Sequence, residues 1–303
     1  MAVRGERVAP QGLIAQTRVI LEMIKFEHTL FALPFALIAT LLAAQSVRMP
    51  HGLPSGRTIA WILAAMVGAR SAAMAFNRIA DAQFDAANPR TASRAIPAGL
   101  LTVGQVAAFT AAAAALFELA AYELNPLCLA LSPIALAAIL GYSFTKRFTS
   151  LAHLALGAAI GIAPVGAWAA VTGRIELVPL LLGAAVTLWI GGFDIIYALQ
   201  DLDFDRQAGL RSLPVRLGPA RALAVSRAMH GVMLACLVAV GILAGLHATY
   251  YVGLTIVAGL IAIEHALVSP DDLSRVNASF FTVNGWVSVC LLAFVLLDRV
   301  FAR

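Results

Sequence analysis

Two groups of acidic side chains interrupt an otherwise apolar chain of 303 residues. Each group lies at or just beyond the end of a hydrophobic stretch, where a carboxylate is costly and therefore indicates a functional site. Each also leads into an arginine-rich stretch that ends in proline, at 90–97 and at 206–214. Carboxylates that hold a divalent cation, beside basic side chains that hold phosphate, are typical of chemistry on a diphosphate. The two groups are Asn77, Asp81 and Asp85, and Asp201, Asp203 and Asp205.

The spacing of these residues predicts a metal site. Asn77, Asp81 and Asp85 are four residues apart, so on a continuing helix they share one face. Asp201 and Asp205 have the same spacing, whereas Asp203 points away from their face. Mg²⁺ takes one or two carboxylates and completes its shell with water and phosphate oxygens. The other reading is that these carboxylates pair with the nearby arginines on a solvated face. The expected metal ligands, which are also the expected catalytic residues, are Asn77, Asp81, Asp85, Asp201 and Asp205.

The two acidic segments resemble each other as a loose internal repeat. In each, an apolar helix is followed by aspartates at i and i+4 and then by an arginine-rich loop. The loop contains Arg-Ala-Ile-Pro at 94–97 or Arg-Ser-Leu-Pro at 211–214, followed by Gly99 or Gly218. Two such copies facing each other would surround one cavity with two aspartate pairs, which fits a two-metal site.

Further polar residues lie at helical spacing from these groups. Arg70 is seven residues before Asn77 on the same face, deeper in the apolar stretch, where a bound anion would balance its charge; the alternative is that it extends to the membrane interface. Asp194 bears the same relation to Asp201. Five of the six histidines, at 28, 153, 230, 247 and 265, are scattered singly and are interpreted as interfacial or packing residues. The expected substrate-binding residues are Arg70, Arg94, Tyr142, Lys146, Arg147, Asp194, Tyr197 and Arg211.

Composition predicts an all-α polytopic membrane protein. The chain is 61% hydrophobic and 12% charged, about half the charged fraction of a soluble domain. We expect about nine transmembrane helices in a bundle around a central cavity, preceded by an amphipathic segment at 1–27, with 28–303 as a single transmembrane domain. No basic stripe with interleaved aromatic residues is present, so nucleic acid is not an expected partner. The expected spans are 28–47, 58–80, 103–123, 126–143, 151–172, 177–200, 221–245, 248–266 and 278–298.

The basic residues predict the orientation of these spans. With a cytoplasmic N-terminus, 15 Lys and Arg residues fall in cytoplasmic segments and 5 on the opposite side, while Arg70 lies inside a span; together these are all 21. Such an excess marks the cytoplasmic side. We therefore expect the N-terminus, both acidic groups and the opening of the cavity on the cytoplasmic side.

At these residues the chain resembles the UbiA family of intramembrane aromatic prenyltransferases. That family carries Asn-Asp-x-x-Asp-x-x-x-Asp after its second span and Asp-x-x-x-Asp after its sixth. Here the first motif runs from Asn77 to Asp85 and the second from Asp201 to Asp205. One position departs from the motif, because Arg78 stands where the family has aspartate. On a helix this position lies about 100° from the predicted metal-binding face, so we expect the metal site to survive.

The resemblance implies that 28–303 is a prenyltransferase domain in the bacterial inner (plasma) membrane. It implies Mg²⁺-dependent transfer of a polyprenyl group from polyprenyl diphosphate to the ring of 4-hydroxybenzoate, in ubiquinone or menaquinone biosynthesis. The partners are then polyprenyl diphosphate, an aromatic acid acceptor and membrane lipid. Two alternatives stay open: the same chemistry on 1,4-dihydroxy-6-naphthoate in the futalosine route to menaquinone, and an ion-coupled membrane transporter. The Asp-Gly-x-x-Ala-Arg signature of CDP-alcohol phosphotransferases is absent.

Overall fold

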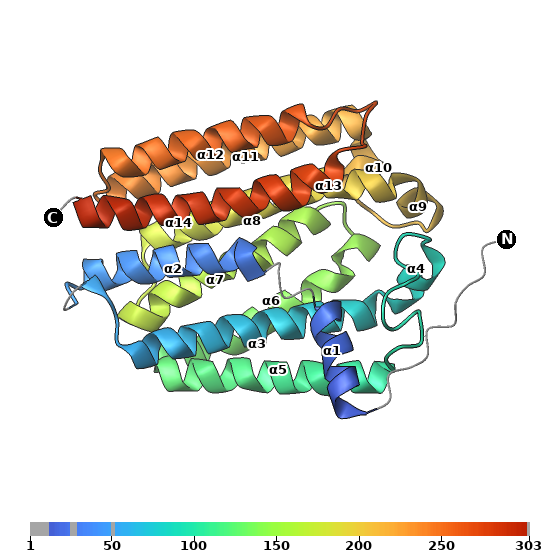
Figure 1. The fold of residues 1–303 in the computed structure, drawn as a ribbon, viewed down its shortest axis with the longest axis horizontal. Helices are drawn as coiled ribbons and strands as arrows, with labels where there is room; N and C mark the ends of the chain where they lie inside the picture. The colour runs from blue at the N-terminus through green and yellow to red at the C-terminus, as the bar shows by residue number, and fades with distance from the viewer. Residues whose placement is uncertain (1–11, 25–28, 50–51, 302–303) are drawn as a thin grey trace.

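Long helices lie side by side along one direction in the computed structural model, which describes residues 12–24, 29–49 and 52–301 (Figure 1). The described residues form helices and loops and contain no strand. The long helices are α2 (Thr29–Ser46), α3 (Gly56–Ala80), α5 (Val103–Leu124), α6 (Pro126–Gly141), α7 (Ala152–Thr172), α8 (Leu177–Ala198), α11 (Pro219–Leu243), α12 (Ala248–Ala266) and α14 (Asn284–Phe301). The shorter ones are α1 (Leu13–Met23), α4 (Ala82–Ala87), η3 (Tyr142–Arg147), η4 (Leu199–Asp201), α9 (Leu202–Gln207), α10 (Leu213–Leu217), α13 (Val276–Ala278) and η5 (Ser279–Val283).

The prediction of an all-α membrane bundle is confirmed. Within the described part of the chain, eight helices are long and apolar enough to cross a membrane. The first expected span corresponds to α2, whose apolar part, Phe31–Ser46, is shorter than these eight. The last expected span begins later than predicted, at Asn284, because the π-helix η5 precedes it. Of the amphipathic segment at 1–27, α1 is described, and 1–11 and 25–27 lie outside the described residues.

The ends of the bundle differ in character. α1, α4 and α9 lie at one end, and α14 ends at the other (Figure 1). At the first end the helices break into short turns and loops that carry both acidic motifs. α1 packs there through Met23 and Ile24 against Ala95 and Leu101, in the loop after the first motif. The fold therefore gathers the chemistry-bearing residues at one end and leaves the rest of the bundle as an apolar frame.

Small residues bring α7 and α8 into close contact. A β-carbon at Gly157 would lie 2.2 Å from the backbone oxygen of Thr187, and one at Gly161 would lie 2.5 Å from the backbone oxygen of Gly183. Helices in membranes associate through such small residues because these allow the backbones to approach. The two helices that carry His153 and Asp194 are thereby fixed relative to each other.

Gly157→Ala should destabilise the protein by about 1–3 kcal/mol, because the new methyl group meets an immobile backbone carbonyl. Gly166→Ala on the same helix is the matched control, since a β-carbon there meets nothing within 4 Å. The measurement is thermal unfolding of the detergent-solubilised protein. Equal melting temperatures for the two variants would contradict the close packing of α7 on α8.

Aromatic side chains form the apolar floor below the motifs. Trp189 on α8 lies edge-on to Phe193, with ring centroids 5.3 Å apart, and also contacts Phe31 and Phe35 of α2. Its indole nitrogen donates to Asn284 Oδ1 at 2.7 Å, which fixes the ring in a fully buried site. Two of these rings, Phe31 and Phe193, line the cavity described next.

Candidate active site

Each acidic motif contains a bend, and the two bends have the same backbone geometry. α3 ends at Ala80, and Asp81 adopts φ −95° and ψ 4° before α4 begins. Asp201, the last residue of η4, adopts φ −102° and ψ 7° before α9 begins. The expected continuous helix is therefore wrong in detail. The side chains of Asn77, Asp81 and Asp85 still share one face. The helical hydrogen bonds continue through the bend, because the Asp81 N–H donates to the Asn77 carbonyl at 2.9 Å and the Asp85 N–H to the Asp81 carbonyl at 2.8 Å.

The loops that follow the two motifs also correspond. Gly99 has φ 72° and Gly218 has φ 78°, values that glycine adopts without the strain of a β-carbon. Together with the matched bends, this supports the internal repeat expected from the sequence.

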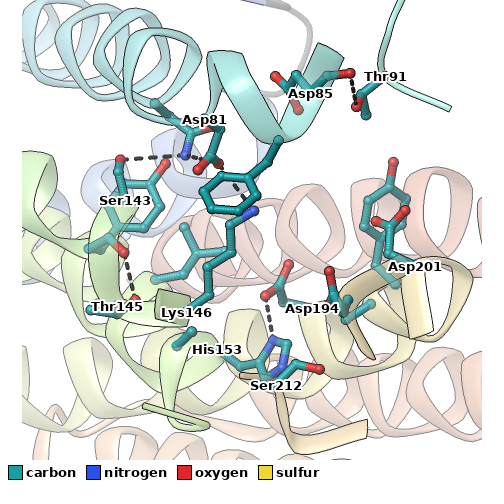
Figure 2. A pocket seen from close by; sticks show the side chains of 18 of the residues that line it. Asp81, Asp85, Thr91, Ser143, Thr145, Lys146, His153, Asp194, Asp201 and Ser212 are labelled. Carbon is teal, nitrogen blue, oxygen red and sulfur yellow. Dashed lines mark hydrogen bonds and ion pairs between the residues drawn. The ribbon is translucent and has the colours of Figure 1, made fainter. Parts of the chain in front are cut away.

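A cavity of about 310 Å³ lies between the two motifs. Figure 2 shows Asp81 and Asp85 on one side and Asp194 and Asp201 on the other, with Lys146 between them. Of the residues expected from the sequence, all line this cavity except Arg147. The lining residues from that set are Arg70, Asn77, Asp81, Asp85, Arg94, Tyr142, Lys146, Asp194, Tyr197, Asp201, Asp205 and Arg211.

Asp81 is only 4% exposed and is held from two sides. Its Oδ2 accepts a hydrogen bond from Asn77 Nδ2 at 3.1 Å and lies 3.3 Å from Lys146 Nζ. Its Oδ1 has no hydrogen-bond partner among the described residues, and the Arg147 guanidinium is 3.8 Å away. The carboxylate is thus oriented through one oxygen, and the other remains available as a ligand.

Asp85 has a similar arrangement. It is 5% exposed, its Oδ1 accepts from Arg94 Nη1 at 2.6 Å, and its Oδ2 is buried without a hydrogen-bond partner in the described part of the chain. Thr91 fixes the turn by donating to the Asp85 backbone carbonyl at 3.1 Å (Figure 2). Each carboxylate of the first motif therefore has one oxygen that accepts a hydrogen bond and one that accepts none among the described residues.

Asp201 in the second motif is engaged by the loop that follows the first. Asn88 Nδ2 donates to Asp201 Oδ1 at 3.0 Å, and Arg90 Nε donates to the same oxygen at 2.8 Å while its Nη2 pairs with Oδ2. Arg90 Nη1 also donates to the Tyr197 hydroxyl at 3.0 Å. Burial lowers the pKa of the Arg90 guanidinium and its hydrogen bond to Asp201 raises it, and the net change is upward. Arg90 therefore stays charged and joins the two halves of the site.

The segment η3 supplies basic and aromatic groups. Lys146 and Tyr142 line the cavity, and Ser143 Oγ lies 3.4 Å from Asn77 Nδ2. The Arg147 guanidinium stacks on Phe144, 4.8 Å from the ring centroid, and donates to the Ala80 carbonyl. Arg147 thus braces the bend at the end of α3 and is not brought into the cavity lining.

Arg211 lines the cavity through the loop after the second motif. Its backbone N–H donates to the Lys146 carbonyl at 2.7 Å, and its Nη1 donates to the Phe148 carbonyl at 2.8 Å. The neighbouring Ser212 lines the cavity with Asp205, where burial raises the pKa of that carboxyl to about 6 and the Ser212 hydroxyl acts to lower it. This loop therefore holds η3 and the second motif together.

The deeper part of the cavity contains a histidine that sequence reasoning assigned to packing. His153 is 4% exposed, and its Nδ1 lies 2.7 Å from Asp194 Oδ2 (Figure 2). Its Nε2 accepts the Leu213 N–H at 3.4 Å, so the proton lies on Nδ1 and is donated to Asp194. The packing interpretation is therefore wrong for His153. Its partner lies 41 residues away, and no local spacing indicates the pair.

Arg70 lies where this cavity meets a second one of about 230 Å³. The second cavity is lined by mostly apolar residues of α3, α5, α6 and α7, and Arg70 is the charged residue among them. Arg70 Nε is buried and has no hydrogen-bond partner among the described residues. Tyr142, Leu156 and Ile160 also line both cavities. The expected deep position of Arg70 is confirmed, and its side chain faces interior space rather than the membrane interface.

The carboxylates fit a hard divalent cation that is shared with an anionic ligand. In the described part of the chain, no three His, Cys, Asp or Glu side chains converge into a complete metal site. The unengaged oxygens of Asp81 and Asp85 are nonetheless the kind of ligand that Mg²⁺ prefers, and Mg²⁺ fills most of its shell with water and phosphate oxygens. The donor set therefore suits a metal that binds together with a phosphate-bearing substrate.

Three more residues of this site are not among those expected from the sequence. Asn88 and Arg90 bind Asp201, although they follow the first motif rather than the second. Arg78 was expected off the metal-binding face, yet it is 8% exposed and lines the cavity. Asp203 has the opposite outcome, because its side chain is 91% exposed and paired with Arg206 at 4.0 Å, as its helical phase predicted.

Comparison with known proteins agrees with this geometry. A model of the UbiA prenyltransferase family matches residues 32–286. The 4-hydroxybenzoate octaprenyltransferase of Alkalilimnicola ehrlichii is 34% identical over 248 residues, which cover 82% of this chain and 84% of that protein. The protein of the same name from Nitrosospira multiformis is 31% identical over 229 residues, covering 76% and 78%.

Solved structures have the same architecture. The apo structure of a UbiA homolog from Aeropyrum pernix K1 is 38% identical with a TM-score of 0.81, and the match covers 90% of this chain and 98% of that chain. A UbiA homolog from Archaeoglobus fulgidus bound to DMAPP and Mg²⁺ is 18% identical with a TM-score of 0.69, covering 92% and 98%, and shares the fold. Because the matched family consists of prenyltransferases, the protein is an enzyme and not the ion-coupled transporter that the sequence left as an alternative. On the extent of the family match, the apolar helical bundle and the paired aspartate motifs, this chain belongs to the UbiA prenyltransferase family.

Proposed function

We propose that the protein transfers a polyprenyl group from polyprenyl diphosphate to the ring of 4-hydroxybenzoate, with Mg²⁺, in quinone biosynthesis. One observation carries this proposal. Two aspartate-bearing bends of the same geometry face a single cavity, and buried carboxylate oxygens of Asp81 and Asp85 have no hydrogen-bond partner in the described structure. The names of the relatives from Alkalilimnicola ehrlichii and Nitrosospira multiformis support the choice of acceptor.

The donor diphosphate is assigned to the rim between the two motifs. Asn77, Asp81 and Asp85 would hold one metal ion, and Asp201 and Asp205 a second. Bound Mg²⁺ supplies positive charge at the leaving oxygen, which lowers the barrier to breaking the bond between that oxygen and the prenyl carbon. Arg90, Arg94 and Lys146 now pair with Asp201, Asp85 and Asp81, and on binding they exchange these partners for diphosphate oxygens.

The acceptor is assigned to the deeper part of the cavity. Arg70 meets its carboxylate, since the buried guanidinium has a donor without a partner among the described residues. Asp194, held by His153 at 2.7 Å, accepts the phenol proton. The ring carbon beside the phenol oxygen then forms the new bond to the prenyl carbon as the carbon–oxygen bond of the donor breaks and diphosphate leaves to the basic rim. The ring proton passes to the released diphosphate, and Asp194 returns its proton to the phenol oxygen. Tyr142, between the two cavities, and Tyr197, near Asp201, border the reacting groups.

The prenyl chain is assigned to apolar surroundings. The second cavity of about 230 Å³ offers mostly apolar side chains next to Arg70, and a long polyprenyl tail extends beyond it into lipid. Apolar walls keep water from the allylic cation, which water otherwise captures.

The direct test uses membranes that contain the protein. Polyprenyl diphosphate is supplied with 4-hydroxybenzoate or with 1,4-dihydroxy-6-naphthoate, with Mg²⁺ or with EDTA, and products are identified by mass spectrometry. We expect a prenylated 4-hydroxybenzoate that forms only with Mg²⁺. Product from the naphthoate alone would change the acceptor, and no product from either would refute the function.

We also propose that the N-terminus and the site face the cytoplasm in a bacterial inner membrane, and that 28–303 forms a single domain. The excess of basic residues at the motif-bearing end supports this orientation. A reporter fused to the C-terminus should be active on the periplasmic side only. Activity on the cytoplasmic side would contradict the combination of a cytoplasmic N-terminus with an odd number of crossings.

A further inference from the structure

Arg78 has an unusual environment for a buried cation. It lies in the last turn of α3, is 8% exposed and lines the cavity. Arg78 reaches the cavity because the face of α3 that lines it is wider than the line through Asn77 and Asp81. Arg70, Met74, Asn77, Arg78 and Asp81 all line the cavity, and their spacing is that of a broad helical face.

The other cations at the rim of the cavity are already paired. Arg90, Arg94 and Lys146 each form an ion pair with an aspartate. Across residues 12–24, 29–49 and 52–301, no ion pair within 4.0 Å and no hydrogen bond engages the Arg78 guanidinium. Its electrostatic neighbours include Arg94, Asp85 and Asp81. Because Arg94 is paired with Asp85 and Lys146 with Asp81, Arg78 is a third cation beside two carboxylates, which leaves positive charge at this wall.

The balance of charge around the cavity depends on this residue. Six cationic side chains line it against five carboxylates, an excess of one positive charge. An aspartate at position 78, as in the motif that the chain resembles, would reverse this to five against six. The cations are Arg70, Arg78, Arg90, Arg94, Lys146 and Arg211, and the carboxylates are Asp81, Asp85, Asp194, Asp201 and Asp205.

We propose that Arg78 binds the diphosphate of the donor directly and allows this site to bind it before any divalent cation is present. A guanidinium presents planar paired donors that match two phosphate oxygens, and its weak hydration suits a buried site. Arg78 lies next to Asp85, one of the residues to which the diphosphate end is assigned. This inference rests on the proposed function and adds a second, metal-independent contact to it.

The test measures binding of inorganic pyrophosphate to the purified full-length protein by calorimetry, in EDTA and in Mg²⁺. Wild type should bind in EDTA, and Arg78→Gln should bind roughly thirtyfold more weakly there, the loss expected when one partner of a buried charge pair is removed. In Mg²⁺ the loss should be smaller, because the metal carries part of the interaction. Arg57→Gln is the matched control: it removes an arginine from the far end of the same helix, 74% exposed, and should change neither affinity.

Each outcome is decisive. Equal affinity of wild type and Arg78→Gln in EDTA would overturn the proposal and make Arg78 a counter-ion of Asp85. Wild type that binds only with Mg²⁺ would overturn it as well, while leaving the proposed function intact. Absence of binding under both conditions would overturn both. Arg78→Met, which keeps an apolar stem of similar length, supplies the same comparison if the Gln variant does not fold.

Discussion

Asp81→Asn should reduce the rate of prenyl transfer by roughly 10³-fold without unfolding the protein. Asparagine keeps the size of the side chain and an oxygen for the bond from Asn77, which is 3.1 Å long in the structure. It removes the negative charge that would hold the metal beside the leaving group. Loss of one preorganised electrostatic contact of this kind costs about 10²–10³ in rate, and the weakened metal adds to it. The measurement is product formation by mass spectrometry as a function of Mg²⁺ concentration.

Asp203→Asn is the matched control for this experiment. Asp203 belongs to the second acidic group, yet its side chain is 91% exposed and paired with Arg206 at 4.0 Å. It should keep nearly full activity, whereas Asp201→Asn should lose activity as Asp81→Asn does. A fully active Asp81→Asn protein would remove the metal site from the mechanism. An inactive Asp203→Asn protein would show that the general acidity of the rim, rather than its geometry, matters.

Arg70→Gln should raise the KM for the acceptor by roughly 100-fold and leave the KM for the donor nearly unchanged. The guanidinium lies where the two cavities meet, with a buried Nε that has no hydrogen-bond partner in the described residues. An acceptor carboxylate that lost this partner would be left buried and uncompensated, which costs about 2–5 kcal/mol. Steady-state kinetics with each substrate varied in turn separates the two effects.

Arg70→Lys provides the comparison for this second prediction. It keeps the positive charge and loses the paired donors, so its acceptor KM should lie between those of wild type and Arg70→Gln. A rise in the donor KM in place of the acceptor KM would move the diphosphate to the deep end of the cavity. That result would exchange the two substrate positions proposed above.

Much of the site was predictable because its main residues are related by local spacing. Asn77, Asp81 and Asp85 stay in phase across the bend, since the backbone hydrogen bonds continue through it at 2.9 and 2.8 Å. Asp203 was excluded correctly for the same reason. Arg70 and Asp194, seven residues before their motifs, face the cavity as expected. The membrane spans were predictable from their length and hydrophobicity, because the bilayer sets both.

What the sequence alone determined is therefore the apolar helical frame and the pairing of two acidic motifs. The tertiary structure decided which charges meet. Asn88 and Arg90 reach Asp201 across more than 100 residues, and His153 reaches Asp194 across 41. Arg78 lines the cavity because the cavity contacts a broader face of α3 than the one that carries Asn77 and Asp81. Helical periodicity determines the direction in which a side chain leaves its own helix. The residue that this side chain contacts depends on how helices distant in the sequence pack together, and the local spacing of residues does not contain that information.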